Sequence, residues 1–83
     1  MATRYFSIFS GDNRIEFYNN IWGKETITYN GEVVSESSSI LGDVHRFYVE
    51  EEGEEVEYEV NVYLKGFRVA YDVYRNDVAL FLS

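Results

Sequence analysis

The chain contains few side chains of the kinds that carry out chemistry. His45 is its only histidine, and it has no cysteine. A histidine that acts as a general base needs a nucleophile or an orienting carboxylate within hydrogen-bond distance. The strand pattern around His45 places Phe47 and Val60 beside it instead. We therefore predict a half-buried strand histidine that is bonded to backbone.

Carboxylates are abundant, but their positions favour solvent rather than a site. Glutamates occupy positions 50–52, 54 and 55 around a glycine. A calcium loop of the EF-hand kind uses Asp or Asn at alternate positions between two helices, and this glutamate-rich turn has neither feature. Glu57, Glu59 and Asp72 would suit acid–base catalysis only inside a cleft. We therefore predict that the protein is not an enzyme and has no metal and no other cofactor.

The composition is that of one small folded domain. The 83 residues include 8 tyrosines, 6 phenylalanines and 1 tryptophan, and 46% of the residues are hydrophobic. Aromatic side chains bury large areas, so a core can form without disulfides. No apolar run reaches the roughly 20 residues of a membrane helix or the roughly 7–15 of a secretory signal. We expect one domain over residues 1–83, located in the cytoplasm.

The chain is strongly acidic, with a net charge of −8 and an isoelectric point near 4.4. This charge repels phosphate backbones and anionic lipid surfaces. The 7 Lys and Arg residues are scattered among 15 acids and form no basic groove. Nucleic acid and membranes are therefore not expected as partners.

Alternating apolar and polar residues indicate strands along most of the chain. Asn30-Gly31 between two such segments is a strong hairpin signal, because both residues tolerate positive φ. The pattern predicts an antiparallel meander of about seven to eight strands, as a β-sandwich or a small open barrel. The sandwich is favoured because each half of the chain has its own apolar face. The expected strands are 4–9, 14–18, 24–29, 32–35, 44–50, 56–64, 67–74 and 78–82.

Two-residue turns at Lys65-Gly66 and Asn76-Asp77 predict the register of the last three strands. All the apolar residues that this register pairs share one face, which a one-residue slip would scatter. The preceding strand fits if Val49 faces Val56, which places Arg46 opposite Glu59 on the reverse face. The expected pairs are Val62–Val69, Val60–Tyr71, Tyr58–Val73, Val73–Leu80, Tyr71–Leu82, Phe47–Tyr58, His45–Val60 and Glu59–Asp72.

The same register places aromatic side chains on the reverse face. A soluble monomer does not leave such a patch bare, so either the N-terminal strands or another chain cover it. Trp22, in a turn beside Gly23, is either a plug for the end of the core or an anchor for a partner. The high average burial of tryptophan favours the plug. The candidate interaction surface comprises Trp22, Tyr48, Tyr63, Tyr74 and Phe81.

Several short motifs resemble one repeat of the Fas apoptotic inhibitory molecule family. They are Ile15-Glu16-Phe17, Gly23-Lys24, Asn30-Gly31, Gly42 and the hairpin from Tyr58 to Val73. The resemblance implies a non-enzymatic, all-β sandwich used in protein interactions, with no catalytic residues to carry over. Members of that family typically hold two such units, whereas this chain has the length of one. Self-association would replace the second unit.

These observations predict a non-catalytic protein-interaction module that uses an exposed aromatic sheet face or edge. Its partner is another protein or, in a homodimer, a second copy of the chain. The alternative is a carrier that holds a small apolar ligand in a cavity between its sheets. Small barrels of about eight strands have room for one ligand.

Overall fold

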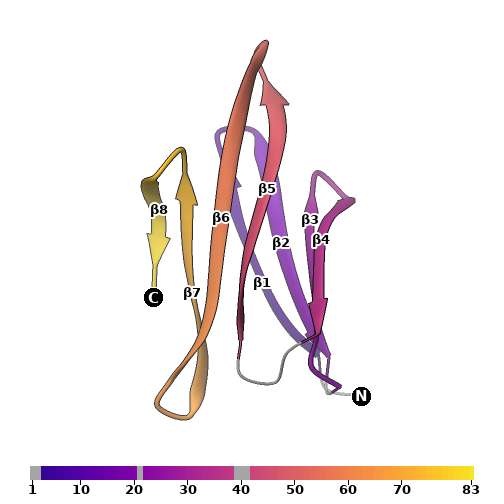
Figure 1. Cartoon of the computed structure of the whole chain (residues 1–83), viewed down its shortest axis with the longest axis vertical. Coiled ribbons are helices and arrows are strands. Elements are labelled where there is room, and N and C mark those ends of the chain that lie inside the picture. Colours follow the sequence, from indigo (N-terminus) through magenta and orange to yellow (C-terminus); the bar gives the residue numbers. More distant parts are fainter. Residues whose placement is uncertain (1–2, 21, 39–41) are drawn as a thin grey trace. The chain divides into compact units, whose positions relative to one another are not determined.

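The computed structural model describes residues 3–20, 22–38 and 42–83, and all regular structure in these ranges is β-strand (Figure 1). No helix in the described ranges could cross a membrane. The strands are β1 (Thr3–Ser10), β2 (Asn13–Asn20), β3 (Lys24–Tyr29), β4 (Glu32–Ser38), β5 (Asp43–Glu51), β6 (Glu54–Lys65), β7 (Arg68–Arg75) and β8 (Val78–Leu82).

The eight strands form two four-stranded antiparallel sheets. Their orders are β1-β2-β3-β4 and β5-β6-β7-β8, so each strand pairs with its neighbours in the chain. The same division separates two compact units, Met1–Ile40 and Leu41–Ser83. The prediction of an antiparallel all-β meander is confirmed, with open sheets rather than a closed barrel.

Most strands have the expected positions, but several are longer than expected. β3 and β8 have the predicted bounds, whereas β4 extends to Ser38 and includes serines that we had expected in a loop. Ser39, also expected in that loop, lies outside the described residues. β5 and β6 extend towards each other, so the glutamate-rich turn shrinks to Glu52-Gly53, where both residues have positive φ. Figure 1 shows this long hairpin of β5 and β6.

Turn chemistry determines how two of the hairpins close. Asn30 and Gly31 have φ values of 51° and 88°, as a type I′ turn requires, which confirms the predicted hairpin. The β6–β7 turn differs from the prediction, because Lys65 pairs with Arg68 and the turn residues are Gly66-Phe67. Only Gly66 has positive φ, at 66°, which is the arrangement of a type II′ turn with glycine in the first position.

This turn shifts the β6–β7 register by two residues from the predicted one. Val62 pairs with Tyr71, and Val60 pairs with Val73. Side chains alternate with a period of two, so the shift leaves each residue on its expected face. The β5–β6 register is confirmed, including Arg46 opposite Glu59. The expected pair of Glu59 and Asp72 is wrong, because Glu59 faces Tyr74.

A β-bulge changes the second half of the β7–β8 pairing. Arg75 pairs with Val78 as predicted, but the register then shifts, so that Val73 faces Phe81 and Leu80 is the extra residue. Leu80 and Leu82, expected to point inward, are 40% and 58% exposed. An extra residue reverses the side-chain alternation beyond it, which a hydrophobic pattern read in strict alternation does not anticipate.

Each sheet has one buried apolar face. In the first sheet, neighbouring strands bring Phe17 and Ile27 together, with exposures of 1% and 0%. In the second sheet, the rings of Phe47 and Tyr58 stack with centroids 5.3 Å apart. The buried apolar residues of these two faces are Ile15, Phe17, Ile27, Phe47, Val56, Tyr58, Val60, Val62 and Val73, whereas Ala70 is buried on the reverse face of the second sheet.

Candidate interaction surface

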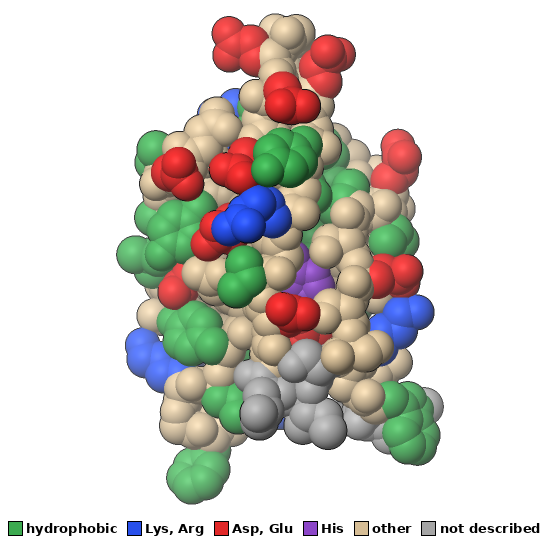
Figure 2. All heavy atoms as spheres, viewed as in Figure 1, with side chains coloured by type: hydrophobic (Ala, Val, Ile, Leu, Met, Phe, Trp, Pro, Cys, Tyr) green, Lys and Arg blue, Asp and Glu red, His purple; other side chains and the backbone are tan. Residues whose placement is uncertain are grey.

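Three of the predicted surface tyrosines lie on the reverse face of the second sheet. Tyr48 in β5 pairs with Glu57, Tyr63 in β6 pairs with Ala70, and Tyr74 in β7 pairs with Glu59. None of these positions shares the face of Tyr58 and Val60, so the three rings stand on the side opposite the buried residues. We call Tyr48, Tyr63 and Tyr74 with their polar neighbours the tyrosine face. Figure 2 shows hydrophobic, acidic and basic side chains mixed over β5 and β6.

Carboxylates fix the hydroxyl groups of two of these tyrosines. Tyr48 donates a hydrogen bond to Glu57 at 3.0 Å, and Tyr63 donates one to Asp72 at 3.1 Å. The hydrogen bond to Glu57 raises the pKa of Tyr48. Burial, followed by the hydrogen bond to Asp72, raises the pKa of Tyr63. Both hydroxyls therefore stay protonated at neutral pH, and each ring is held in one orientation.

Arg46 links the glutamates of the tyrosine face. Its guanidinium lies 2.6 Å from a carboxylate oxygen of Glu59 and 3.4 Å from one of Glu57. The hydrogen bond to Glu59, and then the negative charge of that residue, raise the pKa of Arg46. Arg46 thus forms ion pairs with both glutamates of the predicted carboxylate trio, and the arginine and the two glutamates together keep one net negative charge. The third, Asp72, accepts the hydroxyl of Tyr63.

Tyr48 is the most exposed tyrosine of this face, with 57% of its surface accessible. Tyr63 and Tyr74 are partly buried along their strands. Ala70, which pairs with Tyr63, is 1% exposed although it lies on the same face. The small alanine therefore leaves no free surface between the larger side chains around it.

Phe81 does not belong to the tyrosine face. Beyond the bulge it lies opposite Val73, on the other side of the sheet from Tyr74. Its side chain is still 39% exposed, because β8 is the outer strand of its sheet. The predicted surface residue is therefore accessible at the edge of the sheet rather than on its reverse face.

Trp22 is exposed, which contradicts the preferred prediction that it plugs the core. It lies in the turn between β2 and β3 and is 75% accessible. The Asn20 side chain organises this turn by accepting hydrogen bonds from the backbone amides of Trp22 and Lys24, both at 3.0 Å. The indole belongs to the first unit, whereas the tyrosine face belongs to the second.

His45 and the acidic residues form no reactive constellation in the described part of the chain. His45 is 2% exposed, so it is fully buried rather than half-buried, and it pairs with Val60 as predicted. Within that part of the chain, no group of three or more His, Cys, Asp or Glu side chains could hold a metal ion. Red side chains gather at the tip of the β5–β6 hairpin in Figure 2.

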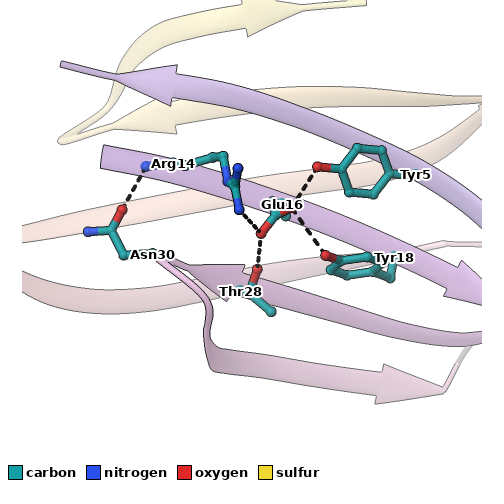
Figure 3. A network of polar contacts seen from close by, with 6 residues as sticks. All are labelled: Tyr5, Arg14, Glu16, Tyr18, Thr28 and Asn30. Atoms are coloured by element: carbon teal, nitrogen blue, oxygen red, sulfur yellow. Dashed lines mark hydrogen bonds and ion pairs between the residues drawn. The ribbon is translucent and has the colours of Figure 1, made fainter. Parts of the chain in front are cut away.

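A polar network that the sequence pattern did not predict surrounds Glu16 in β2 (Figure 3). Its carboxylate accepts hydrogen bonds from the hydroxyls of Tyr5 at 2.6 Å, Tyr18 at 3.1 Å and Thr28 at 3.3 Å. Arg14 adds an ion pair at 3.3 Å. Glu16 is 6% exposed, and these donors compensate the burial of its charge. The signal was the alternation Arg14, Glu16, Tyr18, which puts these three side chains on one face.

A second missed group lies on the buried face of the other sheet. Glu51 accepts hydrogen bonds from Tyr58 at 2.5 Å and from two guanidinium nitrogens of Arg75, the closer at 2.9 Å. The hydrogen bond to Glu51 raises the pKa of Arg75. Tyr58 and Arg75 pair directly, but only in the shifted register, so the predicted register could not bring them together.

Comparisons of the chain with protein-family models, curated proteins and solved structures find no match. The resemblance to the Fas apoptotic inhibitory molecule family therefore stays an expectation from short motifs. The geometry of the chain itself carries the functional argument.

Proposed function

We propose that this protein is a non-catalytic protein-interaction module and that the tyrosine face of its second sheet is the contact surface. The observation that carries the proposal is that two tyrosines of this face are hydrogen-bonded to carboxylates, Tyr48 to Glu57 and Tyr63 to Asp72. Tyrosine and arginine are enriched among residues that dominate binding energy at protein interfaces. Rings already held in one orientation lose little conformational entropy when a partner binds.

The charge pattern of the face also supports a protein partner. Arg46 forms ion pairs with both Glu57 and Glu59 within the face, so a partner meets a connected cluster of charges with one net negative charge rather than two isolated carboxylates. Burying paired charges beside aromatic rings costs less than burying a single charge. The strongly acidic composition disfavours nucleic acid as the alternative partner.

Tyr48→Ser tests the proposal, with Tyr5→Ser as its control. The two tyrosines are matched, because both are about half exposed, at 57% and 53%, and both donate a hydrogen bond to a glutamate. Immobilised wild-type and variant proteins are incubated with extract from the source cells. Proteins recovered by the wild type are then purified and titrated against each variant.

The proposal expects a partner whose affinity falls about tenfold or more with Tyr48→Ser and changes little with Tyr5→Ser. Circular dichroism verifies that both variants are folded. Equal affinity of that partner for the wild type and for Tyr48→Ser would remove the tyrosine face as the contact surface.

A further inference from the structure

The outer strands β4 and β8 occupy equivalent positions in the two units. Each follows a two-residue turn in which both residues have positive φ, Asn30-Gly31 before β4 and Asn76-Asp77 before β8. Each pairing then slips at the same distance from its turn, between Ile27 and Thr28 in the first sheet and between Val73 and Tyr74 in the second.

The asparagine of each turn also makes the same two hydrogen bonds. The backbone amide of Asn30 donates a hydrogen bond to the backbone carbonyl of Arg14 at 2.8 Å. The side-chain oxygen of Asn30 accepts one from the backbone amide of Arg14 at 2.9 Å. Asn76 makes the same pair of bonds with Glu57, at 2.8 and 3.0 Å. The two units are thus built on one plan, and β4 serves as an internal reference for β8.

Compared with β4, β8 lacks polar residues. Positions 32–36 of β4 read Glu-Val-Val-Ser-Glu, whereas positions 78–82 of β8 read Val-Ala-Leu-Phe-Leu. All five residues of β8 are exposed, and Val78 and Leu82 reach 66% and 58%. Outer strands usually carry charges that discourage pairing with another chain. β8 carries none.

The end of β8 is held firmly against β7. The Ser83 hydroxyl donates to the carbonyl of Tyr71 and accepts the Tyr71 amide, both at 2.8 Å. The Ser83 amide donates to the side chain of Asp72 at 3.0 Å. The apolar edge is therefore fixed in place before any partner arrives, which lowers the entropic cost of pairing.

We propose that β8 pairs antiparallel with β8 of a second copy of this chain, joining two second sheets edge to edge. The proposal deepens the proposed function, on which it rests, because it identifies a self-association site at the edge of the sheet that carries the tyrosine face. A contact of one short strand is small, so we expect a weak, micromolar dimer.

Charge is what identifies a second copy as the occupant. A two-fold axis beside Leu80 places Val78 of one copy across from Leu82 of the other, so no like charges meet. The same arrangement of β4 would place Glu32 against Glu36, and like charges directly opposite destabilise a pair. Of the remaining outer strands, β5 carries several charged residues and β1 carries one, Arg4. Among the outer strands of the described sheets, β8 alone contains no charged residue, so pairing with its own copy brings no charge into the contact.

The bulge at Leu80 does not distinguish the two edges, because β4 has one at the equivalent position. A bulge interrupts the backbone ladder locally and increases the twist of the strand. Burial of the exposed side chains of β8 therefore carries much of the contact, together with backbone bonds on either side of the bulge.

The principal test introduces glutamates into β8 at the two positions where β4 has Glu32 and Glu36. The double variant V78E/L82E and the wild type are compared by sedimentation velocity from micromolar concentrations upward. We expect a wild-type dimer that is weakened about tenfold or more in the variant. Val33→Glu is the control, because it adds a charge to an exposed valine of β4, 57% accessible, and should leave the dimer unchanged.

A second test does not depend on how V78E/L82E folds. The chain has no cysteine, so Leu80→Cys introduces a single thiol. Two copies paired about Leu80 bring these thiols within disulfide distance, so mild oxidation should give a covalent dimer in high yield. Val34→Cys, at the equivalent bulge of β4, should stay monomeric.

Three results would overturn the proposal. They are a wild type that stays monomeric at high concentration, a folded V78E/L82E that dimerises as tightly as the wild type, and equal cross-linking of the two cysteine variants. If the wild type is monomeric, and if a protein that it captures from cell extract no longer binds V78E/L82E, the edge of β8 pairs with a strand of that other protein instead. A dimer that persists in Tyr48→Ser, with no partner dependent on Tyr48, would retain this proposal while removing the proposed function.

Discussion

Glu16 shows how one carboxylate organises the polar face of a sheet. Three hydroxyls and a guanidinium from β1, β2 and β3 converge on it, so it links three strands through side chains alone. The hydrogen bond from Tyr5 is the largest contribution that lowers the pKa of Glu16, and burial opposes it. The network thus favours the ionised form, which is the form that can accept every one of these bonds.

The lowered pKa predicts an acid sensitivity that depends on Glu16. The folded state binds the proton of Glu16 less tightly than the unfolded chain does. The stabilisation that ionised Glu16 gives the folded state is therefore fully present above pH 4.5, the ordinary pKa of a glutamate. It is lost as the pH falls from there through the folded pKa. We expect Glu16→Gln to lower the melting temperature at pH 7 and to flatten the decline of stability below pH 4.5. Thermal unfolding followed by circular dichroism from neutral to acidic pH measures both effects.

Glu36→Gln is the control for that series. Glu36 forms an ion pair with Lys24 at 3.2 Å, but both side chains are about half exposed. Surface ion pairs of this kind contribute little to stability. A Glu16→Gln curve that parallels the wild type at every pH would show that the network does not hold its carboxylate in the ionised form.

At the scale of strands and hairpins, alternation predicted which face each residue occupies better than it predicted which residues pair. The β6–β7 register differs by two residues from the expected one, and hydrophobic pattern is blind to a shift of two. The difference arose in the turn, where glycine takes the first central position rather than the second. The pattern therefore predicted the correct face for Tyr48, Tyr63 and Tyr74, although the predicted β6–β7 register gave Tyr63 and Tyr74 the wrong cross-strand partners.

The bulge limits what alternation can predict. Leucine does not mark a bulge in the sequence, and the register shift beside Leu80 places Phe81 on the face opposite the predicted one.

The predicted burial of Trp22 was also wrong, because the average burial of tryptophan does not determine the exposure of one in a particular turn. Groups such as Glu51 and Arg75 depend on the actual register, so they could not be found before it was known.

The hairpin turns make a prediction of their own, centred on Asn76. Its side chain satisfies the Glu57 amide, and its φ of 47° is unfavourable for most residues. We expect Asn76→Ala to destabilise the protein by about 2 kcal/mol, since it loses both the hydrogen bond and the tolerance of positive φ. Asn76→Asp keeps the acceptor and Asn76→Gly keeps the φ, so both should cost less. Denaturant unfolding gives the order.

Hydrogen exchange separates the two causes of the Asn76 effect. The Glu57 amide should exchange faster in both Asn76→Ala and Asn76→Gly, because neither variant provides the acceptor, and should stay protected in Asn76→Asp. Asn30 makes the same bonds to Arg14 and also donates its side-chain amide to Asn13 at 3.0 Å, so at this position the comparison is restricted to the alanine and glycine variants, where alanine should again cost more than glycine. A glycine variant of Asn30 that costs more than the alanine variant would contradict the common plan of the two turns.

For the molecule as a whole, charge determines where association is tolerated. A net charge of −8 makes two copies repel each other at neutral pH. The acids are widely distributed over the strands and turns, and β8 is an outer strand without them. A contact through β8 therefore places its uncharged surface at the point of closest approach.

The salt dependence of the dimer follows from this separation of charge and contact. Sodium chloride screens the repulsion between the two acidic copies, with a screening length of about 10 Å at 0.1 M. A contact through uncharged β8 strands contains no ion pair that the same salt could weaken. We therefore expect the dissociation constant of the dimer to fall as sodium chloride rises, and to fall again as the pH approaches the isoelectric point near 4.4 while the protein stays folded. Sedimentation equilibrium over a series of salt concentrations measures the trend, and Val33→Glu should follow it in parallel. A dimer that dissociates as salt is added would be held by ion pairs, and its contact would have to lie on a charged surface rather than on β8.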